Sequence, residues 1–582
     1  MKVSDFIAKF LKSCGVNYVY GCIGGAAAHL VDSIFREGIR FVHCYHEQCA
    51  AFGASASAKY AGTLKVAVAT SGPGATNFIT GIADAYFDSS PVLFITGQVN
   101  TYDFKYRRPI RQYGFQETDI VSIVRPITKY SILLDRVDRV EDEMAKAVRI
   151  ALSGRPGPVL VDIPMDVQRG DISPKRIGPV VADRARSIIR DEDLEELHET
   201  IKSSKKPLIL AGGGCRVSKA KESLVSFAEK LSIPVVVSLL GKDSFPNDHR
   251  LFAGYIGAYG NRYANMAMLK SDLLLVLGSR LDSRQTGNVL TPFCEKRIFQ
   301  VDLEPDETDR RFPNRKYVVS DVRDFIEQLT GLVDTEGSNA IRADWMDYLK
   351  RLKQMFPPSS EPKRAKVKTF HYDTMEEISR NLSPEDIICV DIGQNQMLAA
   401  QVLEIKRRQR FITSGGMAPM GYALPASVSI AIENNKRVVV IAGDGGMQLN
   451  IHELNTVGKL CLPMVIFVFN NKSLGMLKQF QDLYFGSRYC DTDENSGYYS
   501  PNFVKIAKAY NIKALRIDRM TPNWRKIIRK VLQEDTKSPI LCQIDFDYST
   551  HIYPKLEFDK PLDKPDPKLT PEEEEKVRSL VI

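Results

Sequence analysis

The chain has 582 residues, 44% of them hydrophobic and 26% charged, which is the ordinary composition of a globular protein. Its net charge of +8 is modest, and the sequence has neither a polybasic tail nor an apolar run of the roughly 18 to 20 residues that a membrane helix needs, so neither nucleic acid nor a membrane is expected as a partner. The N-terminus lacks the apolar core of a signal peptide, and the ten scattered cysteines contain no CxxC pair, so we expect reduced thiols and a cytoplasmic location.

Three groups of strand-like runs, each alternating with helical stretches, divide the chain. KVAVA and PVLFITGQ belong to the first group, PLILA and DLLLVLGSR to the second, and RVVVIA and MVIFVF to the third. Continuous apolar strands between helices are typical of parallel sheets that are covered on both faces. We therefore predict an α/β fold of three doubly wound parallel-sheet domains. Polar stretches with proline separate them, and the predicted ranges are 1–166, 193–345 and 366–550, followed by a tail at 551–582 that we expect on the surface.

Two runs of the third group end in small polar residues. RVVVIA leads into Gly443, Asp444 and Gly445, and MVIFVF ends in Asn470 and Asn471. In such sheets, ligands bind beyond the carboxyl ends of the strands. The glycines allow backbone amides to approach a phosphate closely, and the Asp and Asn oxygens suit Mg²⁺. The pattern indicates a diphosphate and metal site, and the alternative is two ordinary strand-end turns.

This pair of motifs, GDG and then NN after 24 residues, resembles the signature of the thiamin diphosphate-dependent enzymes. YHEQCAAFGASASAKYAG, ATSGPGATNFITGIADAY, SGGMAPMGYALPAS and NNKSLGMLKQFQ are similar to stretches of the acetohydroxyacid (acetolactate) synthase large-subunit branch. The resemblance covers residues 1 to about 550. It implies pyrimidine-binding, central flavin-type and diphosphate-binding domains in that order. The implied activity is a Mg²⁺-dependent carboligation, in which pyruvate is decarboxylated and its two-carbon unit is transferred to a ketone.

The resemblance assigns catalytic positions in the first domain. Glu47 matches the glutamate that hydrogen-bonds the aminopyrimidine of the cofactor, a task that needs a carboxyl group in a mostly apolar site. The other matching positions border the reacting centre or its channel, and they are Gly25, Phe115, Gln116 and Lys129. Glu47 alone would be an unremarkable acid at a helix start, so the surrounding motif carries this interpretation.

In the third domain the resemblance implies a metal held by Asp444, Asn471 and the backbone carbonyl of Ser473. Met420 matches the bulky residue that keeps the cofactor bent. Asn395 departs from the family, which usually has His at this position. The implied cofactor contacts are Gly393, Gln394, Met420, Gly443, Gly445, Gly446 and Met476.

The second domain has glycines after two of its strands. Alone they indicate tight turns. In the resembled branch, residues at these positions contact a largely structural FAD, so the resemblance implies FAD as a further cofactor. Tyr259 replaces the usual His of the flavin loop. The implied contacts are Arg155, Gly213, Gly214, Gly278, Arg280, Arg284, Glu307 and Asp321.

The acceptor ketone is left open, because the sequence departs from the branch beside the substrate channel. Phe480 stands where the branch has a Trp that selects a larger 2-keto acid. The segment before FQE is longer than usual and contains Arg107, Arg108 and Arg111, which suit a diphosphate group. A nucleotide-linked keto-sugar is therefore an alternative acceptor. The interpretation of the segment without a function is a solvated, charged loop.

The resemblance also implies a homodimer or homotetramer, since Glu47 and Asp444 meet across a subunit interface in the family.

Two further hypotheses about the function remain. A simple 2-keto acid decarboxylase would release acetaldehyde. A catalytically silent binding or regulatory subunit would be expected to lack Glu47, Asp444 or Asn471, all of which are present.

Overall fold

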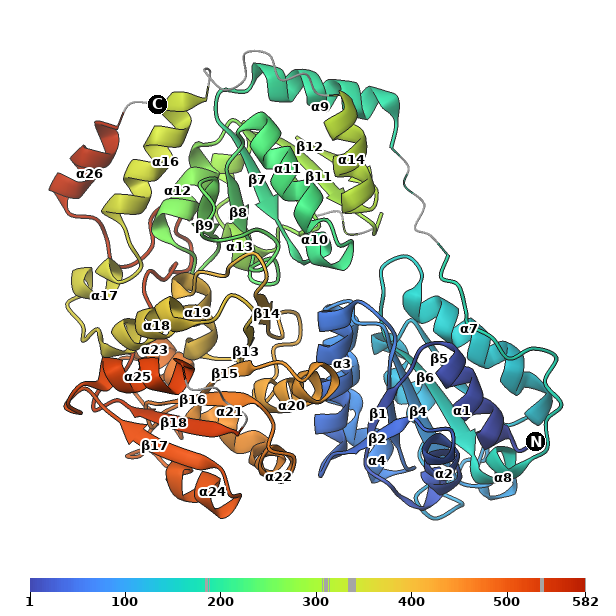
Figure 1. The fold of residues 1–582 in the computed structure, drawn as a ribbon. Helices are drawn as coiled ribbons and strands as arrows, with labels where there is room; N and C mark the ends of the chain where they lie inside the picture. Colours follow the sequence, from blue (N-terminus) through green and yellow to red (C-terminus); the bar gives the residue numbers. More distant parts are fainter. Residues whose placement is uncertain are drawn as a thin grey trace.

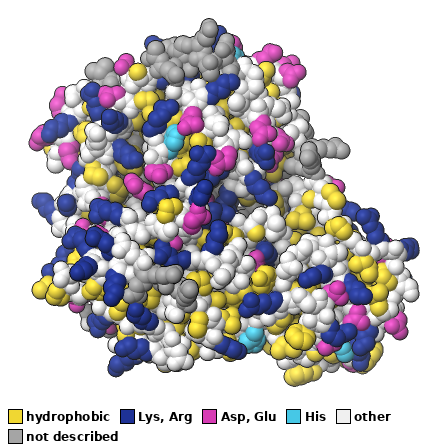
Figure 2. Space-filling view, in the orientation of Figure 1, with side chains coloured by type: hydrophobic (Ala, Val, Ile, Leu, Met, Phe, Trp, Pro, Cys, Tyr) yellow, Lys and Arg dark blue, Asp and Glu magenta, His cyan; other side chains and the backbone are white. Residues whose placement is uncertain are grey.

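The computed structural model of the chain describes residues 1–183, 187, 189–305, 307, 312, 314–332, 342–533 and 538–580. These residues form three six-stranded sheets, all of whose strand pairs are parallel apart from isolated bridges, with helices around each sheet (Figure 1). The predicted fold class is confirmed. In this part of the chain no helix has the length and apolar character needed to cross a membrane. Basic and acidic side chains are interspersed over the face that Figure 2 shows.

The first sheet is built from the N-terminal part of the chain, and its strand order is β2-β1-β3-β4-β6-β5. Its strands are β1 (Tyr18–Gly21), β2 (Arg40–His43), β3 (Lys65–Ala69), β4 (Val92–Gln98), β5 (Tyr130–Leu133) and β6 (Val159–Pro164). Its helices are α1 (Val3–Ser13), α2 (Ala28–Arg36), α3 (Glu47–Ala61), α4 (Pro73–Asn77), α5 (Ile79–Phe87), α6 (Ile120–Val124), α7 (Val140–Leu152) and α8 (Met165–Arg169).

The second sheet has the order β12-β11-β10-β7-β8-β9. Its strands are β7 (Pro207–Ala211), β8 (Val235–Val237), β9 (Phe252–Tyr255), β10 (Leu273–Leu277), β11 (Arg297–Asp302) and β12 (Arg315–Val319). The helices of this part and of the connection that follows are α9 (Asp191–Ser203), α10 (Gly213–Val217), α11 (Lys221–Leu231), α12 (Arg262–Lys270), α13 (Ser283–Thr286), α14 (Val322–Leu332), α16 (Ala343–Met355) and α17 (Ser360–Arg364).

The third sheet has the order β14-β13-β15-β16-β18-β17. Its strands are β13 (Ile387–Val390), β14 (Arg410–Ile412), β15 (Val438–Gly443), β16 (Met464–Asn470), β17 (Lys513–Ile517) and β18 (Ile540–Asp545). Its helices are α18 (Phe370–Asn381), α19 (Gln394–Val402), α20 (Ala423–Asn434), α21 (Asp444–Leu449), α22 (Leu454–Lys459), α23 (Gly475–Tyr484), α24 (Phe503–Ala509) and α25 (Trp524–Gln533).

The strand orders reveal where each sheet can bind a ligand. The first and third sheets have the same strand order. In each, successive strands are added on one side of the starting strand and then on the other, and this reversal point lies between β1 and β3 in the first sheet and between β13 and β15 in the third. The middle sheet has the order of a dinucleotide-binding domain and reverses between β7 and β10. Crevices for ligands form at such points, beyond the carboxyl ends of the strands.

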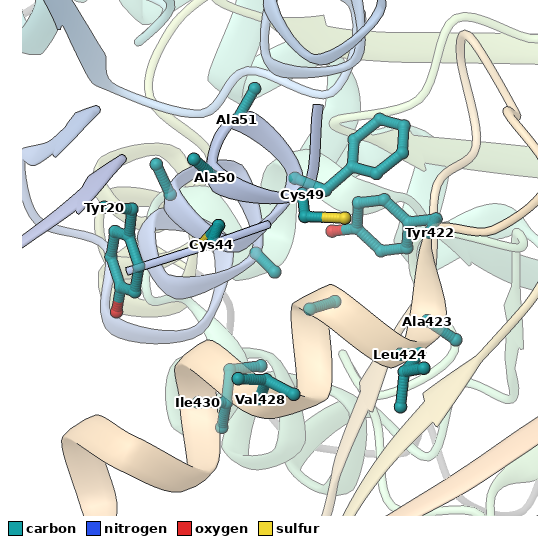
Figure 3. Close-up of a cluster of buried hydrophobic side chains, with 14 of the residues drawn as sticks. Tyr20, Cys44, Cys49, Ala50, Ala51, Tyr422, Ala423, Leu424, Val428 and Ile430 are labelled. Atoms are coloured by element: carbon teal, nitrogen blue, oxygen red, sulfur yellow. The ribbon is translucent and has the colours of Figure 1, made fainter. Parts of the chain in front are cut away.

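The first and third parts pack together through α3 and α20, which lie side by side (Figure 1). Both helices contribute to one buried cluster, which includes Ala50 of α3 and Val428 and Ile430 of α20 (Figure 3). Small residues allow the close approach: a Cβ added to Gly53 would lie 3.2 Å from Cβ of Ser429. Consequently, the buried face of α3 is occupied by this contact within the chain.

The tail is partly buried, so the prediction that it lies on the surface is wrong for its first half. Leu562 is fully buried in a cluster with residues of the middle part, because the tail crosses that domain. Arg262, itself buried and paired with Glu361 at 2.8 Å, donates to the carbonyl of Pro567. The helix near the end of the tail, α26 (Pro571–Arg578), has no buried residue.

Candidate functional site

A small cavity of about 110 Å³ lies at the reversal point of the third sheet. Gly393 follows β13, and α21 begins at Asp444 directly after β15, so both strand ends contribute to the cavity wall. The wall contains the implied cofactor contacts and metal ligands of this domain, which are Gly393, Gln394, Met420, Gly443, Asp444, Gly445, Gly446, Asn471, Ser473 and Met476. The third sheet therefore brings all of them to one place.

Asp444 is the acid of this cavity, and only 2% of its surface is exposed. Burial raises the pKa of its carboxyl group to about 7, although the Tyr498 hydroxyl donates to Oδ2 at 3.0 Å. No Lys, Arg or His among the described residues is paired with it. A buried carboxylate without a neutralising partner is costly. This environment therefore fits a divalent cation.

The neighbouring amide side chains form a closed network. Asn471 donates to Thr550 at 2.8 Å, and its Oδ1 accepts from the amide of Ser473 at 3.2 Å. Gln394 donates to the carbonyls of Gly475 and Thr550. The side chain of Gln394 is thus engaged within the protein, which positions the loop between β16 and α23. The oxygen ligands that Mg²⁺ prefers are available here from Asp444 and from the loop.

Close backbone approach in this cavity depends on glycine. A Cβ added to Gly446 would lie 2.3 Å from Oδ1 of Asp391, a distance at which atoms overlap. Asp391 is buried and accepts hydrogen bonds from the amides of Gly421 and Ala423, and burial raises its pKa to about 6. The same carboxylate therefore fixes both the start of α21 and the loop that carries Met420.

A larger cavity of about 810 Å³ lies at the reversal point of the middle sheet. The loops after β7 and β10 touch each other: a Cβ added to Gly278, whose φ is +57°, would lie 2.5 Å from Cα of Gly214. The implied FAD contacts in its wall are Arg155, Gly213, Gly214, Gly278, Arg280, Arg284 and Asp321. Glu307 is outside that wall and instead pairs with Arg155 at 2.8 Å, with Oε1 facing Nη1.

The two cavities are neighbours. Five residues belong to the walls of both, and they are Ile392, Gly393, Met420, Met476 and Leu477. Met420 and Met476 thus separate the small cavity beside Asp444 from the larger cavity of the middle sheet. Unbranched, polarisable methionines adapt well to such a shared wall.

Four of the five implied catalytic residues of the first domain, all except Lys129, form a separate group at the reversal point of the first sheet. Glu47 begins α3, where a carboxylate is stabilised by the helix dipole, and it accepts from Asn77 at 2.9 Å. Its Oε1 faces Gly74, and Gln116, at φ +64°, packs against Gly72.

Gly25 and Phe115 complete this group at the protein surface, and Phe115 is 86% exposed. Glu47 is not among the residues that line the two cavities of the third and middle sheets. Within the described chain, Glu47 and Asp444 therefore do not share either of these cavities.

Lys129 lies elsewhere. Its Nζ donates to the carbonyls of Ile150 and Ser153, both at 2.6 Å, and of Arg155 at 2.8 Å. Burial lowers its pKa to about 8. The ammonium group thus caps the C-terminus of α7 and holds the loop that carries Arg155, and it is outside the walls of both cavities.

Phe480 lines the larger cavity within an aromatic group that the sequence did not reveal. Its ring centroid is 4.7 Å from that of Tyr484 and 6.3 Å from that of Phe558, a residue of the tail. Lys555, also from the tail, lies over Tyr484 at 4.9 Å. No local motif marks Lys555 or Phe558, because only the path of the tail brings them here.

The basic segment before Phe115 is exposed and anchored at both ends. The buried carboxylate of Glu117 accepts from the amides of Lys105 at 2.9 Å and Tyr113 at 2.7 Å. Between these anchors Arg107, Arg108 and Arg111 are exposed, and the guanidinium of Arg108 lies 4.6 Å from the ring centroid of Tyr113. The three arginines are outside the walls of both cavities.

Comparisons with known proteins cover the three parts of the chain. Profiles described as thiamine pyrophosphate enzyme N-terminal TPP binding domain, central domain and C-terminal TPP binding domain match residues 1–123, 194–329 and 391–544. The chain is 36% identical to the probable acetolactate synthase large subunit of Methanocaldococcus jannaschii, over 94% of this chain and 92% of the relative.

Two further relatives have the same type of name. The acetolactate synthase large subunit of Corynebacterium glutamicum is 36% identical over 88% of this chain and 82% of its own length. The chloroplastic acetolactate synthase 1 of Zea mays is 35% identical over 95% of this chain and 87% of its own length. The three matched domains and these near full-length similarities show that the chain belongs to the thiamine pyrophosphate-dependent enzymes, in the branch of the acetolactate synthase large subunits.

Proposed function

We propose that the protein decarboxylates pyruvate and transfers the resulting two-carbon unit to a ketone acceptor, with Mg²⁺ and FAD beside thiamine pyrophosphate. The observation that carries this proposal is the shared wall of the two cavities, since it would bring a metal-bound diphosphate and a flavin next to each other. When bound, thiamine pyrophosphate supplies the carbanion chemistry.

The residues of the chain have separate tasks in this reaction. Asp444, Asn471 and the carbonyl of Ser473 would hold Mg²⁺ against the diphosphate, and the amides at the start of α21 would donate to its oxygens. Glu47 would exchange a proton with the aminopyrimidine. Met420 would support the cofactor from the side of the larger cavity. Replacing Glu47 by Gln is expected to lower kcat by about 100- to 10,000-fold, as for the loss of a general acid–base group, while leaving cofactor binding in place.

We infer that two copies of the chain form the site, because Glu47 does not line the cavity that contains Asp444. Coexpression of two inactive variants, Glu47→Gln and Asp444→Asn, tests this arrangement. In a mixed dimer, one of the two sites would combine an intact Glu47 with an intact Asp444, so activity would return. If each chain formed its own site, mixed dimers would remain inactive, and this outcome would refute the arrangement.

FAD is proposed for the larger cavity on its strand order, its glycine loops and its volume. Two arginines, Arg280 and Arg284, are available for its phosphates, and the carboxylate of Asp321 is available for hydroxyl groups. Absorption spectroscopy of the purified protein measures flavin content. Arg155→Ala should reduce it, and Arg351→Ala, which alters an exposed pair on α16, is the matched control. A protein that binds no flavin at all would exclude this cofactor.

A nucleotide-linked keto-sugar is a second candidate acceptor, favoured by the three exposed arginines of the segment anchored on Glu117 and by Phe480. Arginine binds diphosphates through paired hydrogen bonds. Product analysis by mass spectrometry, with pyruvate alone and then with a nucleotide-linked 4-keto-deoxysugar, separates the candidates. Acetolactate formation that the sugar does not affect would eliminate the keto-sugar. A sugar adduct that is two carbons heavier would support it, and its yield should fall in Arg107→Ala/Arg108→Ala.

Release of acetaldehyde without any acceptor product would instead indicate a simple decarboxylase. Protein that binds the cofactors but consumes no pyruvate would indicate a binding or regulatory subunit without catalytic activity. Pyruvate consumption and acetaldehyde can be followed in the same reactions, so one set of assays distinguishes all the candidates.

A further inference from the structure

A cluster of potential metal ligands lies where the first and third parts of the chain meet. Cys49 belongs to the first turn of α3, whereas His452 and Glu453 belong to the 3₁₀ helix η6 (Ile451–Glu453) that precedes α22. One ligand atom of each, a thiol sulfur, an imidazole nitrogen and a carboxylate oxygen, lies within 4.8 Å of the other two. The three residues are far apart in sequence and are brought together by the packing of α3 on the C-terminal domain.

The contacts within the cluster leave ligand atoms unused. Sγ of Cys49 is 3.3 Å from Nε2 of His452. Oε1 of Glu453 accepts from the amide of Tyr45 at 3.3 Å, but its Oε2 is buried and has no hydrogen-bond partner among the described residues. Only 1% of the Glu453 surface is exposed. A buried carboxylate oxygen without a partner is destabilising unless something binds it.

The groups around the cluster do not supply a positive charge. Among the described residues no Lys or Arg is paired with Glu453, whose side chain is buried where η6 meets the start of α3. Cys49 is 1% exposed, so the thiol is poorly placed to act as a nucleophile on a substrate. A cation between the three groups would supply the partner that Oε2 of Glu453 lacks among the described residues.

We propose that Cys49, His452 and Glu453 bind a thiophilic divalent cation, with Zn²⁺ as the expected ion. A thiolate, an imidazole and a carboxylate are all established zinc ligands, and bonds of about 2.0 to 2.3 Å place such atoms about 3 to 4 Å from one another. The observed spacing therefore needs little rearrangement. Binding releases the thiol proton, so that Cys49 ligates as the thiolate.

His46 is positioned to complete the coordination. It is the N-cap residue of α3, and its ring centroid lies 6.2 Å from that of His452. Its Nδ1 accepts from the amide of Gln48 at 3.1 Å, so the neutral ring carries its proton on Nε2, and His46 could bind a cation only after this hydrogen bond is broken. A rotation of this half-buried ring, or a water molecule, would supply the fourth ligand of a tetrahedral site.

The position of the site indicates its role. Cys49 follows Glu47 by two residues, so the cation would tie the first turn of α3 to η6 of the C-terminal domain. It would thereby fix the start of the helix that carries the proposed proton-transferring acid. This makes the cation structural, because no cavity of the proposed reaction includes any of the three ligands.

Cobalt substitution tests the proposal directly. The full chain is stripped with a chelator, reconstituted with thiamine pyrophosphate and excess Mg²⁺, and titrated with Co²⁺, and the thiolate-to-cobalt charge-transfer band is recorded in the near ultraviolet. One equivalent should produce the band, Zn²⁺ should displace it, and Zn²⁺ should raise the thermal unfolding midpoint. Mg²⁺ does not compete, since it prefers oxygen ligands.

Three variants complete the experiment. Cys49→Ala should abolish the band, and His452→Gln, a change at a half-buried residue that the fold tolerates more easily, should weaken Co²⁺ binding by about tenfold or more, since even outer-sphere changes cost 10- to 100-fold. Cys461→Ala, which removes an exposed cysteine, is the matched control and should leave the band unchanged. Absence of the band in the unaltered protein, or a band that persists in both Cys49→Ala and His452→Gln, would overturn the proposal.

Discussion

Lys59 is completely surrounded by protein and connects three elements of the structure. Its Nζ is 3.1 Å from Asp84 and 2.7 Å from Asp88, and it donates to the Tyr422 hydroxyl at 3.1 Å. At most 2% of any charged side chain in this group is exposed. Burial alone would lower the pKa of Lys59, but the two carboxylates raise it above its usual value. Lys59 is therefore charged in the folded protein.

Replacing Lys59 by Met would leave two buried carboxylates side by side without their cation. Breaking a buried ion pair by removing one partner costs about 3 to 5 kcal/mol, because the other charge stays desolvated. We expect a loss of that size in the free energy of unfolding. Asp88 also accepts from the amides of Gly415 and Gly416, which line the larger cavity, so flavin affinity should fall as well.

Urea unfolding of the holoenzyme measures this effect. Lys9→Met, a change at an exposed lysine of α1, is the control and should stay within about 0.5 kcal/mol of the unaltered protein. The double variant Lys59→Met/Asp84→Asn should recover part of the loss, because the new amide can donate to Asp88. If Lys59→Met proved as stable as Lys9→Met, the ion cluster would not stabilise this interface and the reasoning would be refuted.

Three further predictions concern single residues. Gly446→Ala should lower the affinity for thiamine pyrophosphate, since its Cβ would overlap Asp391, whereas Gly331→Ala, with no atom within 4 Å of the new Cβ, should not; equal binding in both would contradict the geometry. Burial lowers the pKa of His371 from 6.5 to about 4, so the unfolded chain takes up its proton first as the pH falls. The stability advantage of the unaltered protein over His371→Gln should therefore shrink by about 3 kcal/mol between these pH values, measured by urea unfolding, and a constant difference would refute this. Lys129→Met should loosen the end of α7 and reduce flavin retention, measured by absorption after gel filtration, while thiamine pyrophosphate affinity stays unchanged; reduced affinity for both would point to a general loss of structure.

Much of the site could be predicted because its signals are local. Gly443 to Gly446 and Asn471 directly follow apolar strands, and the parallel arrangement of those strands brings their ends to one edge of the sheet. The sequence order of the strands also made a doubly wound fold predictable. The equal strand orders of the first and third sheets, however, are set by pairings between distant segments, and no short motif encodes them.

Several contacts could not be predicted from the sequence, because they join segments that are separated along the chain. Lys129 has the motif of a channel residue but donates to three carbonyls near the end of α7. Lys555 and Phe558 reach Phe480 only because the tail folds back over the middle domain. The cluster of Cys49 and His452 likewise exists because α3 packs against the C-terminal domain.

The division of the chain into three sheets explains why the proposed site needs more than one surface. Each sheet has one reversal point, and each reversal point holds one set of groups: Glu47 with Gln116 in the first, glycine loops with arginines in the second, and an acid with amides in the third. The second and third sets adjoin through Met420 and Met476. The first set stays apart from the two cavities, because α3 packs against α20 and no residue at its start lines either cavity. The packing that joins the domains within a chain therefore leaves Glu47 half-buried and outside both cavities, as a site shared between two copies would require.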